Sequence, residues 1–419
     1  MGVQPRPTMG RSRFAALGVL ALLVAHAATA QEPAVARHDS AGVVDTTKRR
    51  AEVSAQDSPE DRGLVVRTAD ESLKLRILGS IRIFGSYDFE GLPRADAFSP
   101  LEIPVPEGAG IDRFYMDARQ TRIGFETTWR KADSSHVLFA RIEADFAGTG
   151  NAFRLRHAYI RLDDNRFILG QTWTAFTDIA SVPLTVDLDG PASSVTLRST
   201  QVRYTHALAR GLSLAGSIES PSIELLASQD SAQTYQSFPD VIGQVRYVRP
   251  GLRVQGAAVL RVLAAAVDNS NRDRVVGSGV MGSVLWDVKP GRQLGAQLVM
   301  GRGISRYVTG VSGRGLDLLL DPDDNEYLAP LIRGAYVSYS FNLRPRMTIN
   351  AILGGLWAPA EDFYPPSAYH SGGTLALNTF FPLFAGTLLG FEGVYGWRSN
   401  VDGQSGSAFR LQARATYDF

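Results

Sequence analysis

The chain of 419 residues contains no cysteine, so disulfide bonds and thiolate metal sites are excluded. Beyond the first 30 residues no stretch approaches about 18 consecutive apolar residues, which excludes a membrane protein built from helices. The formal net charge is only +1. A chain without a strong excess of one charge has no general attraction to nucleic acid, and we expect no nucleic-acid partner.

The N-terminal segment has the pattern of an export signal. Arg6, Arg11 and Arg13 precede an apolar run that begins at Phe14, and a small-residue cleavage pattern ends at Ala30. The run is too short to span a bilayer, so we predict a signal peptide over residues 1–30, cleaved after Ala30. Residues 31–72 are polar and charged without helical or strand periodicity, which predicts a flexible periplasmic extension.

From residue 73 to residue 419, segments of roughly ten residues alternate between apolar and polar side chains, which is the length of transmembrane strands. The last segment is the clearest: Phe409, Leu411, Ala413, Ala415, Tyr417 and Phe419 share one face, and Arg410, Gln412, Arg414, Thr416 and Asp418 share the other. The connectors alternate between short and long, about seven short and eight long. The five tryptophans fall near segment ends, as interfacial side chains do. We therefore predict an all-β protein, a transmembrane antiparallel barrel of about 16 strands.

Strand alternation assigns arginines to the inside of this barrel. The predicted lumenal arginines of regular segments are Arg122, Arg141, Arg203, Arg253 and Arg261. Near His157 the basic residues change parity, and a β-bulge there would bring Arg154 and Arg156 to the lumen as well. Alternatively, some of these arginines pair with carboxylates such as Glu143 and Asp145 and only neutralise charge.

The third long connector, residues 174–191, is rich in Ile, Val and Leu, and it carries Asp178, Asp187 and Asp189. Surface loops of this composition need a place to bury their apolar side chains. We predict that the loop folds into the barrel and constricts the pore, with its aspartates facing arginines across a small gap. The alternative is an external loop packed on a neighbouring subunit.

Three segments carry a family resemblance: Leu169-Gly170-Gln171-Thr172-Trp173-Thr174-Ala175-Phe176, Asp187-Leu188-Asp189-Gly190-Pro191 and Gln201-Val202-Arg203-Tyr204-Thr205. Together they resemble the DcaP-like family of bacterial outer-membrane porins, most densely over residues 123–206. The resemblance implies a homotrimeric channel whose third long loop narrows the pore and whose basic lumen favours anions such as dicarboxylates. The coiled-coil extension that the resemblance would imply is not predicted here, because residues 31–71 show no heptads.

The functions that compete are a passive channel, an outer-membrane hydrolase and a tethering or adhesion barrel. A hydrolase would need a nucleophile, base and carboxylate motif near the rim, and no such motif is evident. The acidic run 321–326 is a candidate Ca²⁺ loop or a solvated turn, and the histidines lack metal-binding spacing. We predict a porin in the bacterial outer membrane, surrounded by lipid and lipopolysaccharide. It admits small hydrophilic solutes, preferentially anions, without enzymatic activity, cofactor or metal.

Overall fold

The computed structural model describes residues 63–419 except 109, 131–135, 164, 227–231, 236–237, 268–270, 322, 324–325, 345, 359–360, 362 and 385. The predicted signal peptide and residues 31–62 of the predicted extension lie outside the described residues.

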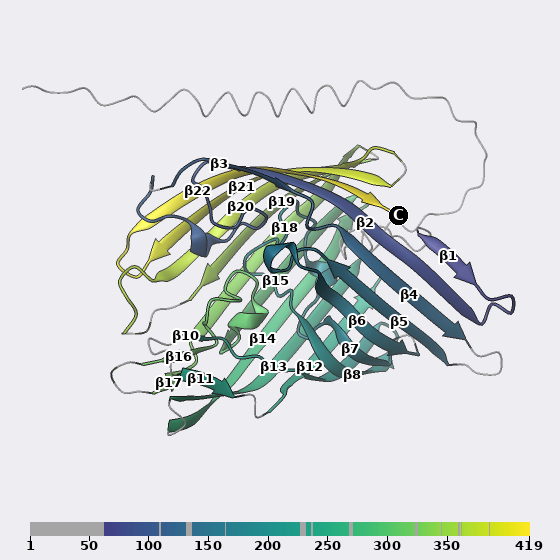
Figure 1. The fold of residues 1–419 in the computed structure, drawn as a ribbon, viewed down its shortest axis with the longest axis horizontal. Helices are drawn as coiled ribbons and strands as arrows, with labels where there is room; N and C mark the ends of the chain where they lie inside the picture. The colour runs from purple at the N-terminus through teal and green to yellow at the C-terminus, as the bar shows by residue number, and fades with distance from the viewer. Residues whose placement is uncertain are drawn as a thin grey trace, which may run out of the picture. The chain divides into compact units, whose positions relative to one another are not determined.

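Sixteen antiparallel strands form a closed barrel, as the alternation in the sequence predicted (Figure 1). The ring closes because β2 pairs with the last strand, β22, on one side and with β4 on the other. In order around the ring the strands are β2 (Leu73–Asp88), β4 (Arg122–Arg130), β5 (Val137–Asp145), β6 (Arg154–Leu162), β7 (Phe167–Trp173), β8 (Arg198–Ala209), β9 (Leu212–Glu219), β12 (Asp240–Arg249), β13 (Leu252–Val267), β14 (Asn271–Lys289), β15 (Arg292–Arg302), β18 (Leu331–Arg344), β19 (Met347–Trp357), β20 (Tyr369–Pro382), β21 (Thr387–Asn400) and β22 (Ser405–Asp418).

The remaining elements are short and belong to the rim or to the connectors. They are β1 (Leu64–Arg67), β3 (Arg113–Asp117), β10 (Leu225–Leu226), β11 (Ala232–Tyr235), β16 (Leu318–Leu320), β17 (Tyr327–Leu328) and the 3-10 turns η1 (Pro100–Glu102), η2 (Thr149–Asn151), η3 (Ile179–Ser181) and η4 (Ser305–Tyr307). None of the helical turns in the described part of the chain has the length and hydropathy needed to cross a bilayer.

Two details differ from the sequence-based expectation. Strand β1 pairs with β2 from Leu64↔Ile77 to Arg67↔Lys74, so strand structure begins within the segment expected to be flexible. Strands β13 and β14 run for 16 and 19 residues, which leaves only residues 268–270 between them. The backbone pairs of these two strands run from Leu252↔Trp286 to Val267↔Asn271, so strand pairing extends into the segment that was expected to be a long connector.

Side-chain direction follows the predicted period of two. On β22, Arg410, Gln412, Arg414 and Thr416 are buried inside the barrel, whereas Tyr417 is exposed on the outside. Many outward positions carry large apolar side chains, including Leu298, Leu377 and Val280, as expected for a surface that contacts lipid.

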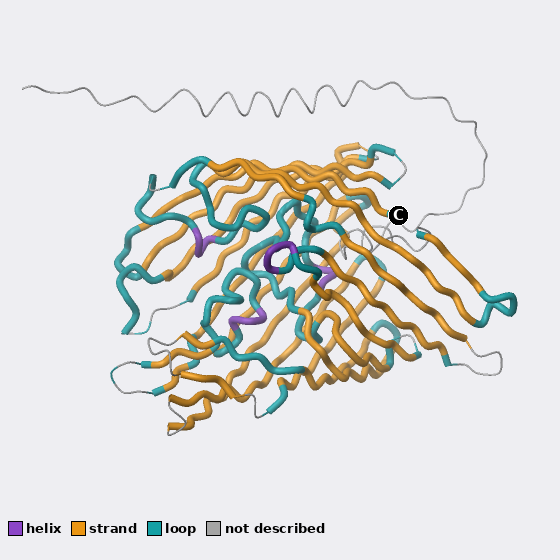
Figure 2. Tube along the Cα trace, in the orientation of Figure 1, coloured by secondary structure: helices purple, strands orange, loops and turns teal. Residues whose placement is uncertain are grey.

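Connectors between the strands occupy much of the barrel interior. Figure 2 shows connectors and short helical turns running through the ring of strands. Phe176 and Val195 from the connector after β7 pack with Tyr307 and Val308 from the connector after β15 in one buried apolar cluster. This cluster buries apolar residues of the third long connector, as the composition of that connector requires.

Candidate functional site

The connector between β7 and β8, residues 174–197, is named the third loop. It follows the inner wall, and residues along the loop contact strands β9, β13, β18 and β21 in that order. The contacts are Ala175 N–H to Glu219 Oε1 (2.9 Å), Arg253 Nη2 to Asp178 Oδ1 (2.6 Å), Tyr336 Oη to Ser181 O (3.2 Å) and Asp187 N–H to Glu392 Oε1 (3.0 Å). In this structure the third loop therefore lies against the inner wall of the barrel.

A first loop, residues 89–112 between β2 and β3, is bound to the third loop. The Phe98 N–H donates to Asp187 Oδ2 at 2.7 Å, and the Leu188 N–H donates to the carbonyl oxygen of Asp96 at 3.0 Å. The first loop therefore helps to position the part of the third loop that carries its aspartates.

A sixth loop, residues 303–330 between β15 and β18, binds the third loop from another direction. Val308 forms an isolated antiparallel bridge with Val195, and the Gly310 N–H donates to the carbonyl oxygen of Ala192 at 2.7 Å. Three segments that are far apart in sequence therefore contact one another inside the barrel, and the sequence analysis identified one of them.

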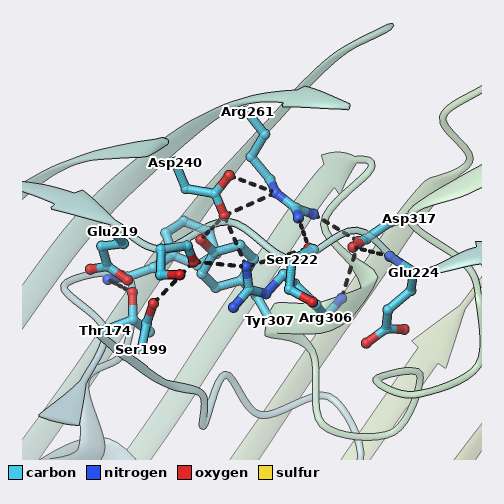
Figure 3. Close-up of polar contacts among 12 residues, drawn as sticks. Thr174, Ser199, Glu219, Ser222, Glu224, Asp240, Arg261, Arg306, Tyr307 and Asp317 are labelled. Atoms are coloured by element: carbon cyan, nitrogen blue, oxygen red, sulfur yellow. Dashed lines mark hydrogen bonds and ion pairs between the residues drawn. The ribbon is translucent and has the colours of Figure 1, made fainter. Parts of the chain in front are cut away.

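An ionic cluster buried in the barrel anchors the sixth loop (Figure 3). Arg261 on β13 has no exposed side-chain surface, and its guanidinium lies 2.8 Å from Asp317 Oδ1 and 3.2 Å from Asp240 Oδ2. The Tyr307 hydroxyl donates to Asp240 Oδ2 at 2.7 Å, and Arg306 Nη1 lies 3.3 Å from the same oxygen. Arg261 was predicted to line the pore, but the loop that covers it makes it an internal anchor.

A cavity of about 270 Å³ lies between the third and sixth loops and the strands β6 and β8. The charged side chains that line it are Arg94, Arg154, Arg156, Arg198, Arg306 and Asp189. Five guanidiniums and one carboxylate line this space, and three of the guanidiniums also pair with the buried carboxylates of Glu143, Asp145 and Asp240. Apolar residues of the third loop, including Ile179, Val182 and Leu184, form another part of the lining.

Arg154 and Arg156 reach this cavity through the predicted bulge. The pairing of β5 with β6 shifts by one residue, with His157 opposite Glu143 and Leu155 opposite Ala144, so that Arg156 is the extra residue. Both arginines also pair with carboxylates, Arg156 with Glu143 at 2.8 Å and Arg154 with Asp145 at 2.8 Å. Arg154 and Arg156 therefore do both things that the sequence analysis had given as alternatives: they line the cavity, and they pair with carboxylates.

The other predicted arginines face inward but do not line this cavity. Arg122 and Arg141 are buried beside Glu143 on neighbouring strands. Arg203 donates to the Trp173 carbonyl oxygen at 3.4 Å, and Arg253 is bound by the third loop. Alternation along a strand predicts the face of a residue, but not whether a loop later covers that face.

The three loop aspartates, which were predicted to face arginines across a small gap, lie in three different surroundings. Asp178 is fully buried and contacts Arg253 directly. Asp187 is buried and accepts backbone hydrogen bonds, including one from Gly190 at 3.0 Å. Asp189 lines the cavity and pairs with Arg94 at 2.8 Å. Asp178 and Asp187 therefore stabilise the position of the third loop, because Asp178 binds Arg253 and Asp187 accepts hydrogen bonds from backbone N–H groups of the loop.

Sequence reasoning missed three of the five cavity arginines. Arg94 and Arg306 are in loops, where strand parity gives no information. Arg198 has the parity of the lipid-facing Val202, yet it is the first residue of β8, at the point where the third loop rejoins the wall. Trp173 was expected at the membrane interface but lines the cavity, with the Arg198 guanidinium carbon 3.7 Å from its ring centroid.

Within the described ranges, no group of three or more His, Asp or Glu side chains is placed to hold a metal ion. The candidate Ca²⁺ run 321–326 falls partly outside the described residues, at 322 and 324–325.

Comparisons with known proteins agree with the barrel. The family model for the DcaP outer membrane protein matches residues 50–283, more than half of the chain. The outer membrane channel DcaP of Acinetobacter baumannii is 21% identical, covers 84% of this chain and 99% of its own, and has a TM-score of 0.74. The anion-selective porin from Comamonas acidovorans is 11% identical, with 83% and 100% coverage and a TM-score of 0.55. OmpT of Vibrio cholerae in its trimer form is 11% identical, with the same coverages and a TM-score of 0.50. A search of curated proteins found no match.

Proposed function

Because this chain belongs to the DcaP outer membrane protein family, we propose that it is a passive outer-membrane channel that prefers small anionic solutes, among them carboxylates. The family and the closed 16-strand barrel support an outer-membrane porin. A porin of this kind needs no catalytic residue or cofactor, since solutes move down their gradient through a wet passage that selects by size and charge.

The observation that carries the anion preference is the lining of the cavity between the third and sixth loops. Five arginines and one aspartate surround a space of about 270 Å³. Protein walls of low dielectric focus the field of these charges, which raises the local concentration of anions and lowers that of cations. We take this cavity as the selective part of the permeation path. The inward arginines Arg122, Arg141 and Arg203 supply a further positive background.

The preference can be tested by neutralising two cavity arginines whose side chains are about two-fifths exposed, Arg94 and Arg154. The double variant Arg94→Gln/Arg154→Gln is expected to lower the anion-to-cation permeability ratio by about fivefold or more, because two charges are removed and each unit charge at about 4 Å in water contributes roughly 1 kcal/mol. The measurement is the reversal potential across a planar bilayer in a salt gradient.

The matched control is Arg166→Gln/Arg210→Gln, which removes two exposed arginines from short connectors on other parts of the barrel. It should leave the reversal potential near that of the unchanged protein. A cation preference in the unchanged protein would refute the proposal.

Assembly and location complete the proposed function. OmpT of Vibrio cholerae, which shares the fold, has been described as a trimer, and we propose that this chain also forms a homotrimer in outer-membrane lipid and lipopolysaccharide. The proposal includes removal of the signal peptide after Ala30. Unheated protein should migrate on a denaturing gel as a band of about three times the monomer mass and convert to monomer on boiling. Monomer migration without heating would contradict the trimer.

A further inference from the structure

We propose that Arg198 is the residue that recognises the carboxylate group of a permeating solute. Its guanidinium stacks on the ring of Trp173 and offers its two terminal nitrogens as paired hydrogen-bond donors. The inference rests on the proposed function, and it identifies one cavity arginine as the specific contact while the others supply the field.

Four of the five cavity arginines are already engaged with carboxylates of the protein. The pairs are Arg94 with Asp189 (2.8 Å), Arg154 with Asp145 (2.8 Å), Arg156 with Glu143 (2.8 Å) and Arg306 with Asp240 (3.3 Å). Arg198 has no carboxylate within 4.0 Å in the described part of the chain. A solute would have to compete with a protein carboxylate at the other four, whereas the donors of Arg198 meet no such competitor.

The position of Arg198 is nevertheless well defined. Its guanidinium carbon lies 3.7 Å from the centroid of the Trp173 ring, and its Nε lies 3.4 Å from His157 Nε2. His157 Nδ1 lies 3.1 Å from Thr172 Oγ1, which fits a neutral imidazole that donates from Nδ1 and accepts at Nε2. The stacking on Trp173 and the contact of Nε with His157 together fix the orientation of the guanidinium plane of Arg198. The two terminal nitrogens remain to form the pair of parallel hydrogen bonds that a carboxylate accepts.

The rest of the cavity indicates what kind of carboxylate fits. Ile179, Val182, Pro183 and Leu184 of the third loop line the same space. A solute with a carboxylate at one end and a small hydrocarbon body would match a charged fork and an apolar wall within about 270 Å³. Chloride has neither the two coplanar oxygens nor the body, so it should respond to the field of all five arginines and not to the geometry of Arg198.

The test measures block of the single-channel chloride current by benzoate, with benzenesulfonate as a probe that has the same body and charge but a tetrahedral head group. In the unchanged protein, benzoate should block at a lower concentration than benzenesulfonate. The variant Arg198→Lys keeps the charge and loses the fork. It should raise the half-blocking concentration of benzoate about tenfold or more while leaving the chloride reversal potential unchanged.

The matched control is Arg94→Lys, the same substitution at a cavity arginine that is already paired with Asp189. It should leave the benzoate block within about twofold of the unchanged protein. If Arg198→Lys does not insert as a barrel, Arg198→Gln replaces it, and the ratio of benzoate to benzenesulfonate block is compared with that of Arg94→Gln.

The outcomes separate the two proposals. Equal benzoate block in Arg198→Lys and in the unchanged protein, an equal loss in Arg94→Lys, or no preference for benzoate over benzenesulfonate in an anion-preferring channel would each overturn the role of Arg198. A channel without anion preference would instead overturn the proposed function itself.

Discussion

Replacement of Arg261 by methionine is expected to lower the free energy of unfolding by about 3–5 kcal/mol and to raise the single-channel conductance. The guanidinium of Arg261 is completely buried between Asp240 and Asp317. Without it, two buried carboxylates face each other without that compensating charge, and Asp317 no longer ties the sixth loop to β13. Since the sixth loop supports the third loop at Ala192, its release should widen the cavity.

Stability can be measured by urea unfolding of the refolded barrel in detergent, and conductance in planar bilayers. Arg333→Met is the matched control, since Arg333 is an exposed residue of the nearby strand β18. Arg333→Met should change the free energy of unfolding by no more than about 0.5 kcal/mol. An Arg261→Met protein with the stability and conductance of the unchanged protein would show that the buried cluster does not anchor the loop.

The second large effect is expected for Glu143→Ala on β5. Glu143 is buried at the centre of a group of arginines: Arg156 Nε lies 2.8 Å away, Arg122 Nη1 lies 3.9 Å away, and Arg141 is in direct contact. Removing the carboxylate leaves three buried guanidiniums with less compensation, which should cost about 3–5 kcal/mol of stability. The same change adds one net positive charge beside the cavity and should therefore strengthen the anion preference.

The opposite directions of these two effects make the prediction specific. Urea unfolding reports the loss of stability, and the reversal potential reports the gain in anion preference. Glu71→Ala is the control, because it removes a carboxylate from an exposed pair with Arg67 at 3.9 Å, where the expected effect is below about 1 kcal/mol. If Glu143→Ala left selectivity unchanged, the arginines beside it would have no influence on the permeating ions.

The strand content was predictable because the rule that governs it is local. Each strand of a transmembrane barrel places every second side chain against lipid, so the alternation of Phe409, Arg410, Leu411 and Gln412 contains the information about both faces. The bulge beside His157 was predictable for the same reason, since a break in period is visible in a short segment. The composition of the third loop likewise predicted that its apolar side chains are buried, either inside the barrel or against a neighbouring subunit.

The identity of the selective residues was not predictable in this way. Arg261 and Arg156 were both predicted to face the lumen, Arg261 by regular alternation and Arg156 through a bulge. One is enclosed by Asp240 and Asp317, and the other lines the cavity. The difference depends on the sixth loop, which lies more than 40 residues further along the chain than Arg261 and covers one part of the wall.

The amino-acid sequence alone therefore determined a closed barrel with an apolar exterior and a polar interior, because strand alternation acts over a few neighbouring residues. The composition of the third loop indicated only that its apolar side chains are buried. The tertiary structure alone decided which arginines remain open to the cavity. Arg94, Arg198 and Arg306 meet there from three separate segments, and contacts between distant loops determine which charges are covered and which stay exposed.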